Sequence, residues 1–181
     1  VDGEIVAQFE KDTLEELGLL KMDFLGLRTE TVLSDAEALV RKKNPEFSIS
    51  KISYEDPEVY ELISSGKCDG VFQLESGGMK NFMKELKPTC LDDIIAGISL
   101  YRPGPMDYIP QYVEGKKNKD NIQYDCPQLE PILKPTYGVI VYQEQVMQIV
   151  RDLAGYSLGR SDLVRRAMAK KKLKAMDTER Q

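Results

Sequence analysis

The sequence predicts a mainly α-helical protein with a short β segment near its N-terminus. Through most of the chain, apolar residues recur at the i, i+3, i+4 and i+7 spacing that places them on one face of a helix. Residues that start helices stand before these runs, and glycine or proline stands after them. We expect about six or seven helices, little sheet and no internal repeat.

The first quarter of the chain combines one predicted strand with one predicted helix. A charged segment at residues 10–16 is expected to be a short helix or loop, and it leads into a strand at residues 19–25. Thr29 or Thr31 then caps a helix that Asn44-Pro45 ends. The apolar face of this helix consists of Val32, Leu33, Ala36, Leu39 and Val40.

Three shorter helices are predicted next. Asp56-Pro57 supplies an N-cap and a first-turn proline for a helix that Gly66 ends. Ser76 precedes the second of these helices, and the third follows Pro88. Their apolar stripes are Met79, Phe82, Met83 and Leu86, followed by Leu91, Ile94, Ile95 and Ile98. Such stripes can line a ligand groove, but we interpret them as core packing.

A long loop is predicted over residues 101–121. It begins with Arg102-Pro103-Gly104-Pro105 and contains a lysine-rich run at residues 115–119, which we interpret as a solvated turn. Long loops in compact domains are often functional.

The last third of the chain is predicted to hold three helices. The first covers residues 127–133, and residues 139–141 form a short strand or buried turn. The second, around Val146, ends at Gly155, and Ser161 caps the third.

The last predicted helix carries a cationic stripe. Arg166, Lys170 and Lys174 recur every four residues, with Arg165 and Lys172 beside them. Like charges at that spacing repel one another unless an anion lies against them, although a lysine-rich run can also be a solvated face.

Composition limits the chemistry that the chain can perform. The 181 residues are 41% hydrophobic, and the net charge is −5. No apolar run long enough to span a membrane and no signal peptide is apparent, so we expect a cytoplasmic protein. The absence of histidine excludes Ser-His and Cys-His catalysis and His-ligated zinc, and the three separated cysteines do not suggest disulfides.

Charge is distributed unevenly. Residues 1–100 carry 11 basic and 20 acidic side chains, whereas residues 101–181 carry 14 basic and 10 acidic ones. Phosphate contacts depend on local basic clusters rather than on total charge, so the acidic total does not argue against nucleic acid as a partner.

Asp23 and Lys21 are the first candidate site residues. On the predicted strand their side chains point to the same face, which suits a divalent metal beside a phosphate. A local ion pair on a solvated face explains the same pattern.

Five motifs in chain order resemble the bacterial DNA polymerase III alpha subunits, which are C-family replicative DNA polymerases. The motifs are LKMDFLGLRT (20–29), GVFQLES (70–76), YRPGPM (101–106), YGVIVYQEQVM (137–147) and RRAMAKKK (165–172). The resemblance implies that residues 1–28 are the last piece of a palm domain and residues 29–181 most of a helical fingers domain.

The resemblance also implies a catalytic role for Asp23. In the family, three aspartates bind two magnesium ions, and Asp23 stands where the last of them is expected. The other two belong to an Asp-x-Asp motif that this chain lacks. We therefore expect an incomplete magnesium site, in a fragment that is inactive alone.

The remaining site residues are expected to bind phosphate. By the resemblance, Lys21 meets nucleotide phosphate or the primer end, or merely offsets Asp23. Arg28 and Arg102 are candidates for the triphosphate. Residues expected to border the nucleotide are Gln73, Glu75 and Ser76, the last of which is equally suited to cap a helix. The residues expected to face the triphosphate or the template backbone are Arg165, Arg166, Lys170, Lys171 and Lys172.

The resemblance thus predicts part of a DNA-directed DNA polymerase acting in DNA replication. Its expected partners are primer-template DNA, deoxynucleoside triphosphates and, through regions beyond this sequence, other replisome subunits. The alternative is a nucleic-acid-binding or scaffolding module without catalysis, in which Asp23 belongs to a structural ion pair.

Overall fold

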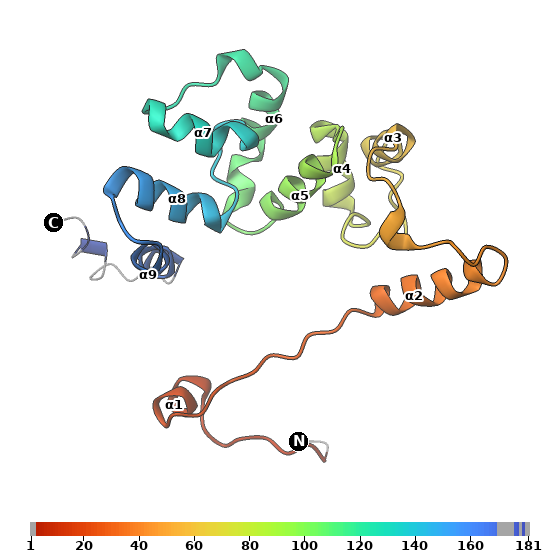
Figure 1. Cartoon of the computed structure of the whole chain (residues 1–181). Coiled ribbons are helices and arrows are strands. Elements are labelled where there is room, and N and C mark those ends of the chain that lie inside the picture. Colours follow the sequence, from red (N-terminus) through yellow and green to blue (C-terminus); the bar gives the residue numbers. More distant parts are fainter. Residues whose placement is uncertain (1–2, 170–175, 178, 180–181) are drawn as a thin grey trace. The chain divides into compact units, whose positions relative to one another are not determined.

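A computed structural model describes residues 3–169, 176–177 and 179 (Figure 1). Contacts divide the chain into two compact units, Val1–Ile52 and Ser53–Gln181. Throughout the described residues the regular elements are helices, and no strand is present. None of the helices in this part of the chain is long and apolar enough to cross a membrane.

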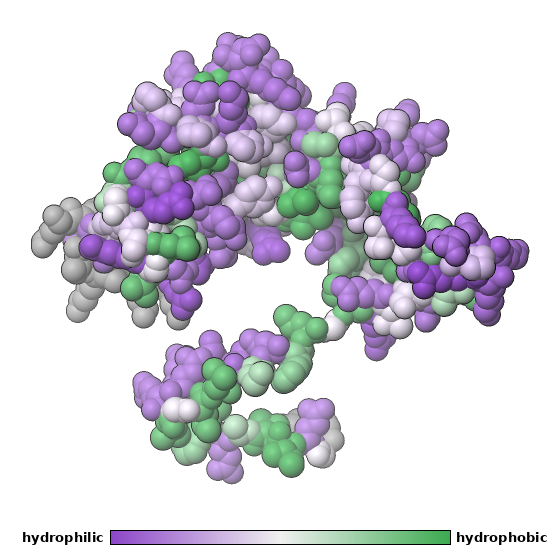
Figure 2. Space-filling view, viewed as in Figure 1, coloured by the Kyte–Doolittle hydropathy of each residue, from purple (hydrophilic) through white to green (hydrophobic). Residues whose placement is uncertain are grey.

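The N-terminal unit contains α1 (Lys11–Glu16), α2 (Arg28–Arg41) and the short 3-10 turn η1 (Ile49–Lys51). The strand predicted at residues 19–25 is wrong, because this stretch is an extended segment with no strand paired to it (Figure 1). A strand needs a neighbouring backbone to hydrogen-bond, and alternating side chains do not supply one. Leu20 and Phe24 are 85% and 88% exposed, and hydrophobic residues show along this segment in Figure 2.

Helix α2 confirms the predicted helix but not its cap. Its N-cap is Leu27, which makes no side-chain capping bond, so the predicted caps Thr29 and Thr31 both lie inside the first turn. The helix ends at Arg41, and the Arg41 Nε donates to the Phe47 carbonyl at 2.7 Å.

The C-terminal unit begins with three helices, α3 (Pro57–Ser64), α4 (Gly77–Leu86) and α5 (Leu91–Leu100). Both predicted caps are confirmed. The Asp56 Oδ1 accepts from the Glu58 N–H at 2.9 Å, and the Ser76 Oγ accepts from the Met79 N–H at 3.3 Å. These bonds satisfy N–H groups that the first turn of a helix leaves free.

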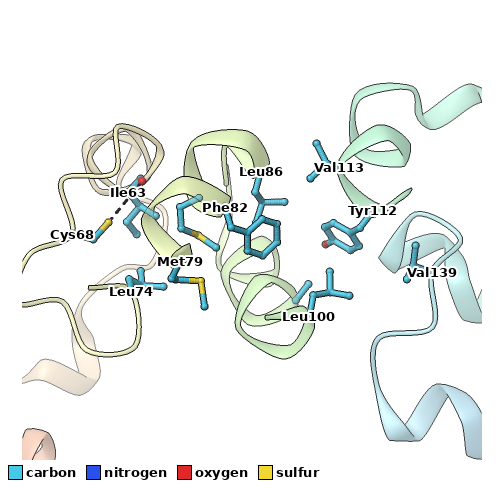
Figure 3. Close-up of a cluster of buried hydrophobic side chains, with 12 residues drawn as sticks. Ile63, Cys68, Leu74, Met79, Phe82, Leu86, Leu100, Tyr112, Val113 and Val139 are labelled. Carbon is cyan, nitrogen blue, oxygen red and sulfur yellow. Dashed lines mark hydrogen bonds between the residues drawn. The ribbon is translucent and has the colours of Figure 1, made fainter. Parts of the chain in front are cut away.

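The core of this unit is built around α4 and α5 (Figure 3). The predicted stripe of α4 is confirmed, since all four of its residues are buried. On α5 the prediction fails in part, because the helix buries Asp93, Ala96 and Leu100 while Leu91 and Ile95 stay exposed. The buried face of α5 includes the charged Asp93, so the spacing of apolar residues alone points to the wrong face.

The loop predicted at residues 101–121 is largely helical. The 3-10 turn η2 (Pro105–Tyr108) leads into α6 (Ile109–Lys117), and η3 (Lys119–Asn121) follows. Proline in the first turn starts a helix rather than breaking it, and Tyr112 and Val113 bury the face that α6 turns to the core.

The rest of the unit consists of η4 (Pro127–Leu129), α7 (Glu130–Leu133), η5 (Lys134–Thr136), α8 (Gln143–Ala154) and α9 (Leu158–Ala169). The helix predicted at residues 127–133 is present as η4 and α7. Residues 139–141 form neither the predicted strand nor a turn; they are irregular backbone that follows a turn at residues 137–138, and Val139 is buried.

Helices α8 and α9 pack against one another. Gly155, at φ 69°, ends α8 as predicted. The predicted cap of α9 is wrong, because the Ser157 Oγ, rather than the Ser161 hydroxyl, accepts from the Arg160 N–H at 3.3 Å. Ser161 is buried inside the helix, where its hydroxyl donates to the Ser157 carbonyl at 3.0 Å.

Candidate functional site

Asp23 and Lys21 form an exposed ion pair in the N-terminal unit. The Lys21 Nζ lies 3.0 Å from the Asp23 Oδ1, and their side chains are 51% and 64% exposed. The two groups therefore do share one side of the extended segment. Arg28, the first residue of α2, is exposed in the same unit.

Asp23 alone does not make a magnesium site. Mg²⁺ requires several oxygen ligands in near-octahedral geometry. Over residues 3–169, 176–177 and 179, no group of three or more acidic, cysteine or histidine side chains is placed to hold a metal ion. The described residues therefore do not fit a complete magnesium site, and Asp23 offers at most one ligand.

The C-terminal unit brings two predicted motifs together at the start of α4. A Cβ atom on Gly78 would overlap the hydroxyl oxygen of Tyr101, so the Tyr101 side chain lies directly against the first turn of α4. The Tyr101 ring also stacks on Phe82, with 6.1 Å between the ring centroids. Ser76 and Arg102 are thereby held at the same corner.

This corner, residues 73–78 and 101–105, presents groups that suit an anion. Gly77 and Gly78 carry no side chains of their own at the start of α4, whose helix dipole favours negative charge. Ser76 caps the Met79 N–H, and the Tyr101 hydroxyl lies against Gly78. Arg102 is exposed, and the turn beyond it contains Gly104 at φ 100° between two prolines. We call this region the α4 corner.

Gln73 and Glu75 border the α4 corner from the preceding turn. Both are exposed, and Gln73 has a left-handed backbone with φ 65°. That conformation is uncommon for a residue other than glycine. It turns the chain so that Leu74 is buried while its neighbours reach solvent.

Helix α9 carries the second predicted group. The Arg165 Nη2 lies 2.7 Å from the Asp162 Oδ1, and the Arg166 Nε lies 2.8 Å from the Asp162 Oδ2. The Arg165 Nη1 also donates to the Gln143 Oε1 of α8 at 2.7 Å. Hydrogen bonding from Arg165 and the nearby positive charges hold the pKa of Asp162 below its usual value.

The other three predicted cations of this group, Lys170, Lys171 and Lys172, lie outside the described residues.

A buried ion pair that the sequence did not reveal links α5 to α6. The Asp93 Oδ2 lies 2.8 Å from the Lys116 Nζ, with side chains only 3% and 12% exposed. Asp93 also accepts from the N–H and hydroxyl of Thr89, and Lys116 donates to the carbonyls of Leu86 and Lys87. Burial raises the pKa of Asp93, but the Lys116 and Thr89 hydrogen bonds outweigh it, so the pKa is below its usual value.

The position of Lys116 corrects the interpretation of the lysine-rich run as a solvated turn. Its ammonium joins the end of α4, the first turn of α5 and the last turn of α6. The available signal was the spacing of Ile109, Tyr112 and Lys116, which places the lysine on the apolar face of a helix.

Gln145 is a second residue that the sequence did not single out. It is 5% exposed, and its Oε1 accepts from the N–H groups of Val141 and Tyr142 at 2.8 and 2.9 Å. Its Nε2 donates to the Ile132 carbonyl at 3.1 Å and to the Thr136 Oγ1 at 2.7 Å. This buried amide fixes the turn from which α8, and with it Gln143, begins.

Comparison with known proteins places this helical fold among polymerase finger domains. Residues 29–181 match the family described as the bacterial DNA polymerase III alpha subunit finger domain. The chain is 50% identical over 181 residues to DNA polymerase III subunit alpha of Treponema pallidum, an alignment that covers 98% of this chain and 16% of that protein. It is 49% identical over 170 residues to the Borreliella burgdorferi protein of the same name, an alignment that covers 94% of this chain and 15% of that protein. The chain is 48% identical over 180 residues to the Bacillus subtilis protein of that name, an alignment that covers 99% of this chain and 16% of that protein.

The chain belongs to the bacterial DNA polymerase III alpha subunit family. It spans 15 to 16% of the length of these three relatives.

Proposed function

We propose that this chain forms part of a DNA-directed DNA polymerase that extends a primer by template-directed, magnesium-dependent nucleotidyl transfer. Residues 1–28 would belong to the palm and residues 29–181 to the fingers. The α4 corner supports this proposal most directly, because it combines an exposed arginine with a helix N-terminus whose first two residues are exposed glycines. Those groups suit the phosphates of an incoming deoxynucleoside triphosphate or of primer-template DNA.

Phosphoryl transfer depends on positioning the phosphates and neutralising their charge. In the α4 corner, the Tyr101 ring stacks on Phe82 and its hydroxyl packs against Gly78. These contacts fix the backbone next to Arg102. The turn beyond Arg102, with its two prolines, limits the conformations of that backbone further. The backbone at Arg102 is therefore restrained before the phosphate arrives, which reduces the backbone entropy lost on binding.

Steady-state incorporation of one nucleotide tests the corner in a complete alpha subunit of a relative in which this chain replaces the matching segment. Arg102→Gln is expected to raise KM for the nucleotide about tenfold, since a charge-assisted hydrogen bond contributes about 1.5 kcal/mol or more. Arg151→Gln is the matched control, because Arg151 is an exposed arginine already paired with Asp152. An unchanged KM in Arg102→Gln would remove the corner from the proposal.

Asp23 is proposed to give one oxygen ligand to magnesium in the complete polymerase. In the same chimeric subunit, Asp23→Ala should abolish extension while leaving primer-template binding largely intact. The isolated chain should not extend a primer. Near-normal extension by Asp23→Ala would refute the catalytic role of this carboxylate.

A binding-only module is the second candidate function, and the exposed Lys21–Asp23 ion pair favours it, because a structural pair needs no metal. Fluorescence anisotropy of primer-template DNA over a salt series tests this alternative with the isolated chain. If the isolated chain binds DNA and the chimeric subunit extends normally without Asp23, the binding-only function is supported.

A further inference from the structure

The two arginines of α9 share one carboxylate but are held in different ways. The Asp162 Oδ1 accepts from the Arg165 Nη2 at 2.7 Å, and the Asp162 Oδ2 forms an ion pair with the Arg166 Nε at 2.8 Å. Both arginines lie one turn beyond Asp162 on the same helix, at i+3 and i+4. A single acidic side chain therefore pairs with two cationic ones.

Arg165 spends its hydrogen-bond donors on contacts within the C-terminal unit. Its Nε and Nη2 both donate to the Asp162 Oδ1, and its Nη1 donates to Gln143 on α8. Its side chain is only 20% exposed. A planar guanidinium whose three nitrogens all have partners is committed to joining α9 to α8 and has little left to offer a ligand.

Within the part of the chain that the structure describes, Arg166 forms its ion pair with Asp162, through the Nε. Its side chain is 64% exposed. Because the Nε lies 2.8 Å from the Asp162 Oδ2, the ion pair restrains the guanidinium from its Nε side and leaves the two terminal nitrogens for a ligand. A fork presented in this way matches the paired oxygens of a phosphate.

We propose that Asp162 is a positioning residue that orients Arg166 toward a phosphate of the polymerisation reaction, while Arg165 and Gln143 anchor α9 to α8. This inference rests on the proposed function and deepens it by separating the predicted cationic cluster into an anchor and a contact. The phosphate belongs either to the incoming nucleotide or to the DNA backbone, and the assay below distinguishes these two sources.

The proposal and simple electrostatics predict opposite effects of neutralising Asp162. If Asp162 were only a negative charge near a phosphate site, its removal would strengthen anion binding, because the net positive charge would rise. If Asp162 orients Arg166, its removal weakens binding, since Arg166 then loses its fixed direction.

The test uses the chimeric alpha subunit with single-nucleotide incorporation and primer-template binding at three salt concentrations. Arg166→Gln should raise either KM for the nucleotide or Kd for DNA about tenfold, and a change confined to one parameter identifies the source of the phosphate. Asp162→Asn should raise the same parameter about threefold or more with kcat nearly unchanged. Gln143→Ala, an exposed substitution that leaves Asp162 intact, should raise it about twofold.

Asp152→Asn is the matched control, because it removes the same charge from an exposed Arg–Asp pair on α8, and it should leave both parameters unchanged. If Arg166→Gln weakens binding but Asp162→Asn improves it or behaves like Asp152→Asn, the positioning role is overturned and the proposed function stands. If Arg166→Gln changes neither parameter, the phosphate contact of α9 itself is overturned.

Discussion

Lys116→Met is expected to destabilise the C-terminal unit strongly, because it removes the cation that neutralises a buried carboxylate. The Lys116 Nζ and the Asp93 Oδ2 lie 2.8 Å apart, with side chains 12% and 3% exposed. Methionine preserves most of the apolar stem of lysine, so the substitution removes the charge with little change in packing volume.

The expected cost follows from the contacts that are lost and those that remain. Removing one partner of a buried ion pair costs about 3 to 5 kcal/mol. Asp93 keeps its two hydrogen bonds from Thr89, which places the cost near the lower end of that range. The carbonyls of Leu86 and Lys87 also lose a donor, and the first of these bonds is partly buried. We expect a loss of about 3 to 4 kcal/mol at pH 7.

The loss should depend on pH with a defined sign. In the unsubstituted chain the pKa of Asp93 is lowered on folding, so its contribution is complete above the ordinary carboxyl pKa of about 3.9 and disappears as the pH falls below it. Without Lys116, burial raises that pKa, so the variant loses stability as the pH rises through the carboxyl range. The difference between the two proteins is therefore largest at neutral pH and shrinks toward pH 3.

Urea denaturation followed by circular dichroism at pH 7 and pH 3.5 measures this difference. Lys134→Met is the control, because its ion pair with Glu130 is exposed and should contribute less than about 0.5 kcal/mol. The reasoning is refuted if Lys116→Met destabilises the chain by less than about 1 kcal/mol at pH 7. It is also refuted if the destabilisation at pH 3.5 is as large as that at pH 7. Asp93→Asn combined with Lys116→Met should recover part of the loss, because no buried charge remains.

Three further predictions concern the same unit. Gly115→Ala should cost about 1 to 3 kcal/mol in urea denaturation, because its Cβ would lie 2.8 Å from both the Cβ and the carbonyl oxygen of Tyr137; an undiminished stability would contradict that close approach. Asp56→Ala should cost about 1 kcal/mol by the same assay, since it removes the N-cap bond of α3, and Asp56→Asn should retain most of that bond. In thiol labelling of the folded chain, Cys90 should react promptly and Cys68 only after unfolding, because Cys68 is fully buried and burial raises the pKa of its thiol; equal rates would show that the core opens readily.

Local signals explain which parts of the fold were predictable. Capping by Asp56 and Ser76 involves residues two or three positions apart, so the sequence alone contains both partners. The end of α8 at Gly155 is equally local. The strand at residues 19–25 failed for the opposite reason, because alternation describes one strand and not the neighbour that must pair with it.

The candidate site was only partly predictable, since its geometry depends on residues far apart in the sequence. The motifs containing Ser76 and Arg102 were recognised separately in the sequence. Only the structure, in which the Tyr101 side chain packs against Gly78, shows that the two motifs lie together. The partnership of Asp93 with Lys116 spans 23 positions, and nothing in either segment alone indicates it. The glycines, prolines and lysines between residues 101 and 121 led to the prediction of a loop where α6 forms, although the apolar spacing of a helix was present in the sequence.

The saturated amide of Gln145 has a consequence for which sequences this fold accepts. Its oxygen takes two hydrogen bonds and its nitrogen gives two, so all the capacity of the side chain is used. Asparagine is one methylene too short, glutamate has no hydrogen to donate, and methionine provides neither function. Gln148, exposed on the same helix, carries no such constraint. Saturation mutagenesis with selection for folding should therefore return almost only glutamine at position 145 and a broad range of residues at position 148.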